Sequence, residues 1–237
     1  MFAFSLTVGA AVETNDWENL SVNSVNRLPA RTYTMPLSSV EDALSDTLEA
    51  PSPYKVSLNG IWRISWAGNP ELRVKDFWKK DFDDANWHTI DVPSCVEMRG
   101  FGSPGYVNVR YPHAMAWPKI LNRQAKLPDY NPVSSYRRHF TVPEKWAGRQ
   151  IILRFDGVYS AYYVWVNGKK VGYAEDSKLP SEFDITDYVN AGGSNLLAVE
   201  VYRWCDGSYL EDQDYFRLSG IFREVYVLSR NKTRIED

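Results

Sequence analysis

The sequence is poor in the residues from which metal-binding and nucleophilic sites are most often built. Its 237 residues include only two cysteines and three histidines. The histidines, at positions 88, 113 and 139, do not have the short spacing that would place two of them on one metal ion, which argues against a zinc site. Cys95 and Cys205 also lack metal-ligand spacing. The sequence does not decide whether they form a disulfide with each other. We interpret both as ordinary buried thiols.

Other absences exclude further classes of function. The sequence contains no Ser-His-Asp arrangement, no glycine-rich loop of the kind that cradles phosphate, and no nucleotide-binding fingerprint. The formal net charge is −3, with 27 basic and 30 acidic residues spread along the chain. Because no basic stripe is present to neutralise phosphates, a nucleic-acid partner is not expected. The apolar stretch at the N-terminus is too short to span a bilayer as a helix, and a membrane partner is not expected either.

The N-terminal region divides into two parts that differ in composition. Residues 1–12 resemble the second half of a secretory signal peptide without its charged leading region. We interpret them as an export remnant, which favours a periplasmic or exported protein over a cytoplasmic one; a disordered tail is the alternative. Residues 13–57 are polar and interrupted by prolines, which predicts an extended arm that needs a surface to lie on. Only residues 38–49 show a weak helical pattern.

Strand signals dominate residues 58–230, and residues 231–237 are interpreted as a linker towards a further domain. Expected strands include segments around 61–66, 89–92, 136–142, 150–155, 162–166, 196–202 and 224–228. The pair Asn167-Gly168 lies between two apolar runs and is the strongest hairpin signal, since both positions tolerate positive φ. No helical pattern alternates with these strands, which argues against a parallel sheet. The sequence therefore predicts an all-β protein, an antiparallel jelly-roll β-sandwich with an extended N-terminal arm.

The most informative segment is 203–224, which connects two expected strands. It contains four carboxylates framed by aromatic residues: Asp206, Glu211, Asp212 and Asp214. Packing like charges so closely is costly unless cations or hydrogen-bond donors relieve the repulsion. Acids beside aromatic rings also suit a sugar, because the acids accept hydrogen bonds from hydroxyls while the rings cover the C–H faces. The segment is thus a candidate polyol-binding loop.

Two other interpretations of this segment remain open. The carboxylates could hold Mg²⁺, Ca²⁺ or Na⁺ together with backbone carbonyls, although the EF-hand spacing is missing. Alternatively they are structural, with Asp206 forming an Asx turn and Glu211 pairing with Arg217 or Arg223. Catalysis is harder to support, because glycoside hydrolysis needs two carboxyl groups on opposite sides of a sugar. All these acids sit in one loop.

Several segments, in the same order along the chain, resemble the N-terminal part of the large bacterial β-galactosidases of glycoside hydrolase family 2. The resemblance runs from about Asp16 to the C-terminus, and the run 206–214 (DGSYLEDQD) is its most specific part. The other segments are 16–19 (DWEN), 26–28 (NRL), 58–63 (LNGIWR), 106–112 (YVNVRYP), 155–158 (FDGV) and 176–184 (DSKLPSEFD). The first domain of that family is a jelly-roll sugar-binding domain, which agrees with the strand pattern.

The resemblance implies roles for particular residues. Asn108 matches an asparagine that hydrogen-bonds the galactosyl group. Asp214 matches an aspartate that contacts the galactosyl group and helps to bind Na⁺. An Mg²⁺ site is implied for five residues of the arm and the domain: Asp16, Asn19, the carbonyl of Val22, Glu175 and Asp206. Glu175 stands where a well-known relative carries a glutamine, so the charge of that site differs here.

The resemblance also implies what the chain lacks. The two catalytic glutamates of the family lie in a TIM barrel several hundred residues further on, so these 237 residues alone are expected to be inactive. The expected function is that of a non-catalytic domain in an enzyme that hydrolyses terminal β-D-galactosides with retention. Its partners would be the galactoside, the barrel domain and, through the arm, further copies of the chain. A stand-alone carbohydrate-binding module and a structural or oligomerisation fragment are the alternatives.

Overall fold

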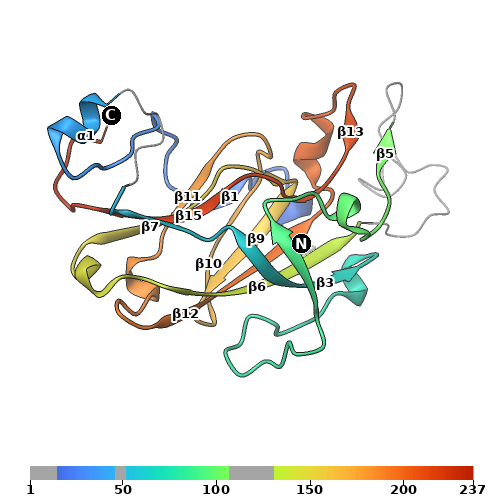
Figure 1. The fold of residues 1–237 in the computed structure, drawn as a ribbon. Coiled ribbons are helices and arrows are strands. Elements are labelled where there is room, and N and C mark those ends of the chain that lie inside the picture. The colour runs from blue at the N-terminus through green and yellow to red at the C-terminus, as the bar shows by residue number, and fades with distance from the viewer. Residues whose placement is uncertain (1–14, 46–51, 107–130, 237) are drawn as a thin grey trace, which may run out of the picture.

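The computed structural model describes residues 15–45, 52–106 and 131–236, and they form an antiparallel β-sandwich (Figure 1). The larger sheet has seven strands, in the order β1 (Ser24–Val25), β10 (Lys169–Ala174), β9 (Ala161–Val166), β12 (Ser194–Tyr202), β6 (Val133–Thr141), β3 (Gly60–Ala67) and β4 (His88–Val92). The smaller sheet has four, in the order β11 (Ser181–Asp184), β7 (Gln150–Phe155), β15 (Val225–Arg230) and β2 (Lys55–Ser57). Two short pairs complete the sheets: β13 (Phe216–Arg217) with β5 (Gly105–Tyr106), and β14 (Gly220–Ile221) with β8 (Val158–Tyr159).

Helical structure is short within the described residues. The α-helix, α1 (Val40–Leu44), is capped by Ser39, whose side chain accepts a hydrogen bond from the N–H of Asp42. Single 3₁₀ turns connect the strands: η1 (Asp16–Glu18), η2 (Pro70–Leu72), η3 (Val96–Arg99), η5 (Glu144–Trp146), η6 (Thr186–Tyr188) and η7 (Asp206–Tyr209). None of the helices in these ranges is long and apolar enough to cross a membrane.

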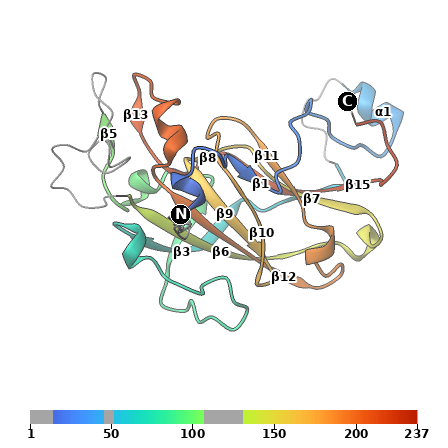
Figure 2. The same cartoon turned by 180° about the vertical axis from the view of Figure 1, so that it is seen from behind.

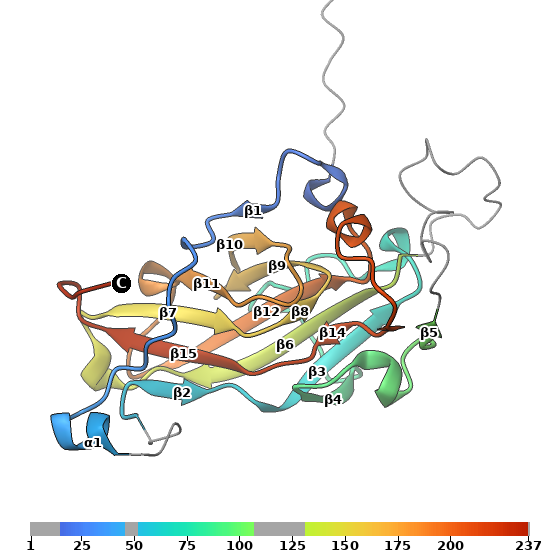
Figure 3. The same cartoon turned by 90° about the horizontal axis from the view of Figure 1, so that it is seen from above.

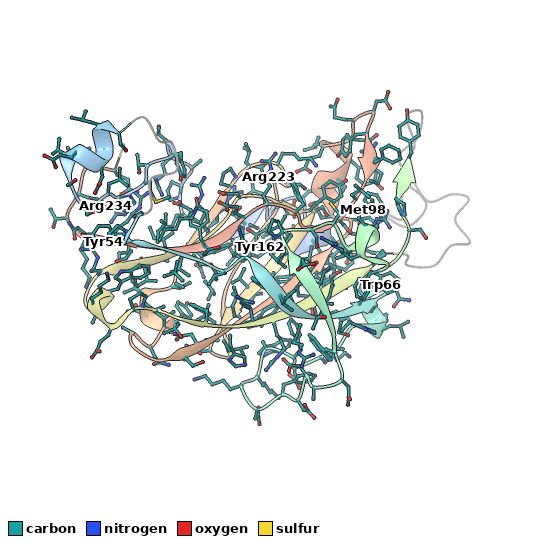
Figure 4. The ribbon with its side chains drawn as sticks, in the orientation of Figure 1. Tyr54, Trp66, Met98, Tyr162, Arg223 and Arg234 are labelled. Atoms are coloured by element: carbon teal, nitrogen blue, oxygen red, sulfur yellow. The ribbon has the colours of Figure 1, made fainter. Side chains whose placement is uncertain are left out.

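The main core lies between the two sheets and follows from the alternation of side chains along each strand. In β7, Ile151, Leu153 and Phe155 point into this core, whereas Ile152 points to the outer face of the small sheet. The facing strands of the large sheet contribute residues such as Val164 and Val199. Tyr162 lies in the middle of the sandwich in Figure 4. The strand pattern in the sequence thus translates directly into the packed interior.

The predicted hairpin at Asn167-Gly168 is confirmed. It joins β9 to β10, and both residues have positive φ, 53° and 84°. The Asn167 side chain stabilises the turn further, because its amide donates to the carbonyl of Tyr188 at 2.7 Å and its oxygen accepts from the N–H of Leu196 at 3.0 Å. The turn is thereby hydrogen-bonded to the neighbouring strand β12 as well as joining β9 to β10.

Several sequence expectations need correction. Residues 38–49 form a helix only over Val40–Leu44 within the part described. The short strands β2 and β11 were not anticipated, because they are four residues or fewer and carry no clear alternation. Cys95 and Cys205 are both free; Cys205 is buried as expected, but Cys95 is only half-buried.

The arm lies on its own domain and wraps around one edge of the sandwich (Figure 3). Trp17 covers the outer face of the large sheet and stacks on Tyr202, with ring centroids 5.0 Å apart. The arm then adds β1 to the edge strand β10. Further on, Leu28 and Met35 cover the outer face of the small sheet. The surface that the arm was expected to need is therefore, over the described residues, the two outer faces of this same sandwich.

A buried ion pair holds the second half of the arm in place. Arg31 donates to both carboxylate oxygens of Glu182 on β11, at 2.8 and 2.6 Å, and both side chains are only 6% exposed. Arg154 on β7 shares the same carboxylate at 3.0 Å and lies over the ring of Tyr33. Two-point binding of a carboxylate by a guanidinium fixes both distance and orientation.

We predict that Arg31→Ala destabilises the domain by about 3 kcal/mol, because it leaves the buried carboxylate of Glu182 with one guanidinium in place of two. Urea unfolding measures the loss, and limited proteolysis reports release of the arm. Arg99→Ala is the matched control: Arg99 pairs with Asp91 at 3.7 Å, but both side chains are about half exposed. Its cost should stay below about 1 kcal/mol. Equal losses for the two variants would contradict the prediction.

Candidate functional site

The acidic segment 203–224 lies at one end of the sandwich. It contains η7, β13 and β14, and β13 projects beside β5 at the end opposite α1 (Figures 1 and 2). Met98, on η3, and Trp66, at the end of β3, lie on this side in Figure 4, whereas Tyr54 and Arg234 lie at the other end. The structure places Asp206 in an inner cluster and Asp214 in an outer cluster, while the other two acids of the segment have structural partners.

The inner cluster consists of Glu175, Cys205 and Asp206. One ligand atom from each lies within 4.8 Å of the others, and all three residues are buried. Glu175 directly follows β10, while Cys205 and Asp206 lie just beyond β12, so two strands of the large sheet that flank β9 bring them together. The hydroxyl of Tyr173 donates to Glu175. A Cβ at Gly207 would lie 2.9 Å from Glu175 Oε2, so only glycine fits there without displacement.

Burial and mutual repulsion make a proton or a cation necessary in the inner cluster. Burial, followed by the neighbouring Asp206, raises the pKa of Glu175 from an ordinary 4.5 to about 8. Burial also raises the pKa of the Cys205 thiol, which therefore stays protonated and is a poor ligand for a hard cation. Two carboxylates of this kind fit Mg²⁺ or Ca²⁺ better than a soft metal.

The backbone of the arm passes beside the inner cluster at Asn23. The N–H of Glu175 donates to the carbonyl of Asn23 at 3.1 Å, directly after Val22. The Asn19 side chain accepts from the N–H of Ser21 at 3.1 Å. The Asp16 carboxylate lies 3.7 Å from Lys170 Nζ. The structure thus brings Glu175 and Asp206 together, with the arm alongside, while Asp16 and Asn19 contact other groups.

The outer cluster surrounds Asp214 and is exposed. The Tyr106 hydroxyl donates to Asp214 Oδ1 at 2.6 Å, and the rings of Tyr106 and Phe216 lie 5.5 Å apart across the β5–β13 pair. Both rings are more than half exposed. An exposed carboxylate next to exposed rings is the combination expected for a polyol. Asn108, two residues beyond Tyr106, lies outside the described residues.

The remaining acids of the segment have structural partners. Asp212 forms an ion pair with Arg217, whose guanidinium lies 4.2 Å from the centroid of the Tyr215 ring. Glu211 accepts from the N–H of Ser177 at 2.8 Å. The alternative in which Glu211 pairs with Arg217 or Arg223 was therefore wrong. Asp206 begins a 3₁₀ turn, where its side chain accepts from the adjacent N–H of Gly207, so the Asx turn of that same alternative was wrong as well.

Sequence reasoning missed one buried acid that supports this region. Glu97 on η3 accepts from the N–H and the hydroxyl of Ser219, at 2.8 and 2.6 Å, and lies 3.5 Å from Arg203. These contacts join η3 to both ends of the acidic segment. The only signal for Glu97 is a single acid next to apolar Val96, which is too weak to identify it from sequence.

The comparisons with known proteins agree on one family. Residues 56–231 match the family described as glycosyl hydrolases family 2, sugar binding domain. The chain is 44% identical over 227 residues to a β-galactosidase of Priestia megaterium, which covers 94% of this chain and 21% of that protein. A β-galactosidase of Clostridium acetobutylicum is 42% identical over 227 residues, covering 94% of this chain and 24% of that protein. The chain thus spans about a fifth of the length of these relatives.

A solved structure supports the fold alone. The β-glucuronidase of an uncultured Clostridium species has a TM-score of 0.55 and 24% sequence identity, and the alignment covers 79% of this chain and 31% of that one. Its low identity restricts the comparison to the arrangement of the strands.

We predict that the domain, kept free of divalent cations, loses stability as the pH rises from about 4.5 to 8. Over this range the unfolded chain releases the Glu175 proton while the folded chain retains it, so deprotonation favours unfolding. Thermal melting in EDTA measures the slope. In Glu175→Gln the group that titrates is removed while an acceptor for Tyr173 is kept, so the slope should flatten; an unchanged slope would contradict the assignment.

Proposed function

This chain belongs to the sugar-binding domain family of the family 2 glycosyl hydrolases, and we propose that it is the non-catalytic sugar-binding domain of a β-galactosidase. The observation that carries the proposal is the match of 94% of the chain to β-galactosidases of which it covers only 21% and 24%. The complete enzyme would hydrolyse terminal β-D-galactosides with retention, and its catalytic carboxyl groups would come from a barrel domain beyond this chain.

The outer cluster is the part of this chain that we assign to the substrate. Asp214 presents an exposed carboxylate, held in position by the Tyr106 hydroxyl at 2.6 Å. It would accept hydrogen bonds from galactosyl hydroxyls, and Phe216 would shield the apolar face of the ring. Asn108 would supply a further hydrogen bond, and Asp214 would also serve as one ligand of Na⁺. The chain would thus position the sugar without breaking the glycosidic bond.

The inner cluster is the part that we assign to Mg²⁺. Glu175 and Asp206 would be its carboxylate ligands, and the arm around Asp16, Asn19 and Val22 would supply the others. The fit rests on two buried carboxylates that repel each other beside the backbone of the arm. When bound, the cation would neutralise both carboxylates. Its role would be structural, because it would link the arm to the segment that also carries Asp214.

We predict that Mg²⁺ at millimolar concentration raises the melting temperature of the wild-type chain by several degrees, because it binds only the folded cluster. Differential scanning fluorimetry with and without EDTA measures the shift. Asp206→Ala should abolish it. Asp187→Ala is the control, since Asp187 is an exposed acid on η6 and should leave the shift intact. A Mg²⁺ shift that persists in Asp206→Ala would remove the basis for the site.

The substrate role can be tested in a hybrid enzyme, in which this chain replaces the matching segment of the Priestia megaterium β-galactosidase. We predict that the hybrid hydrolyses nitrophenyl β-galactoside. Asp214→Ala should lower kcat/KM by about 30- to 100-fold, since charge-assisted hydrogen bonds to the sugar are lost. Tyr106→Phe should lower it less than about 10-fold, because the carboxylate remains. Asp187→Ala again serves as control. Full activity of the Asp214→Ala hybrid would refute the assignment.

A further inference from the structure

The outer face of the large sheet contains a cavity that the proposed function does not use. It lies between the start of the arm and the segment that follows η2, and its volume is about 160 Å³. In Figure 1 the loop between η2 and β4 (teal to green) lies at the bottom of the view, below the large sheet, whereas the β5–β13 pair lies at the upper right. The side chains that give the cavity its chemistry are Arg73, Lys75, Trp78, Tyr163, Lys170 and Glu200.

The aromatic wall of the cavity follows from the alternation along β9. Val164 points into the sandwich core, so its neighbours Tyr163 and Trp165 point outward. Trp78, from the loop, stacks on Trp165 with centroids 4.9 Å apart and planes only 7° from parallel. The loop and the sheet therefore form a continuous apolar wall along one side of the cavity.

The base of the cavity carries a buried carboxylate. Glu200 is on β12, and its side chain is only about 5% exposed. The Tyr202 hydroxyl donates to Oε1 at 2.8 Å, and Arg73 Nε lies 3.4 Å from the same oxygen. Among the described residues, no hydrogen bond or ion pair uses Oε2. A buried carboxylate with one free oxygen is an acceptor that a ligand can complete.

Two lysines also line the cavity. Lys170 Nζ lies 4.4 Å from the centroid of the Tyr163 ring and 3.7 Å from Asp16. Lys75 is exposed on the loop opposite. The cavity thus combines an aromatic wall, a buried acceptor and cationic donors. Its volume is close to the roughly 150 Å³ of a cavity that binds benzene, so a larger ligand such as a pyranose would extend partly into solvent.

From these features we infer that the cavity is a second carbohydrate site, which binds one pyranose ring between Trp78, Glu200 and Lys75. Ring hydroxyls donate to Glu200 Oε2 and accept from Lys75, while C–H groups contact the aromatic wall. Such a site would hold a sugar away from the outer cluster, as an anchor for a longer glycan. The inference does not depend on the sugar-binding role proposed for the outer cluster, because it concerns a different set of residues.

The competing interpretation is that Glu200 only binds Arg73 to fix the loop to the sheet. That role requires neither Lys75 nor the open cavity. It therefore predicts that no sugar binds at the cavity. A direct measurement of sugar at the cavity separates the two interpretations.

The experiment labels the tryptophan indole groups of the full 237-residue chain with ¹⁵N and follows their resonances while galactose, glucose or glucuronate is added to about 100 mM. We expect the Trp78 and Trp165 resonances, assigned with Trp→Phe variants, to shift in a saturable manner with at least one of the sugars. Glu200→Gln should weaken this binding about 10-fold, and Lys75→Ala, which alters only an exposed side chain, about 3-fold.

Asp214→Ala is the control, because it removes the outer cluster and should leave the Trp78 shifts unchanged. The inference is overturned if none of the three sugars moves these resonances, or if Lys75→Ala and Glu200→Gln bind as tightly as the wild type. Neither outcome bears on the hybrid-enzyme assay, so the two proposals stand or fall separately.

Discussion

The architecture depends on one constraint: strands in both sheets carry large apolar side chains on both of their faces, whereas a sandwich buries only one face of each sheet. Ile152 and Tyr226 point out of the small sheet, and Trp165 and Tyr202 point out of the large one. Leaving this surface in water would cost about 25 cal/mol for each Å². The arm and the 70–87 loop cover these faces, so neither is an appendage of an already complete domain.

This covering determines where the polar chemistry can lie. The arm reaches the large sheet where β10 and β12 end, which is also where Glu175 and Asp206 are buried. The loop covers the same sheet further along β9 and leaves the cavity above Glu200. Both carboxylate sites are therefore consequences of how the outer face is covered, because each lies where a covering segment meets the sheet. Any change that releases the arm should disturb the inner cluster before it disturbs the sandwich core.

Much of the fold could be predicted from the sequence, since the alternation in segments such as 150–155 and the Asn167-Gly168 turn are local signals. The short strand β11 could not, because its residues are recruited by pairing with β7 and with the arm. The sequence indicated which acids are candidates for binding, but it did not predict the residues that each of them contacts. Glu211 and Asp212 are adjacent in sequence, yet Glu211 contacts the N–H of Ser177 whereas Asp212 pairs with Arg217. Only the path of the folded chain decides between these partners. Jelly-roll connectivity, the domain boundaries and the assignments of Asn108 and of both cations stay predictions.

The carboxylates of the acidic segment differ in how deeply they are buried, although they are close in sequence. Asp206 is buried against Glu175, where a charge needs a cation or a proton, whereas Asp214, eight residues later in the numbering, is exposed beside aromatic rings. Neither environment is that of a hydrolytic pair, which requires two carboxyl groups about 5 to 10 Å apart across one glycosidic bond. Asp212 is already neutralised by Arg217, and Glu211 is turned towards a backbone N–H. The geometry of the segment therefore suits binding better than bond cleavage, which agrees with the non-catalytic role that we propose.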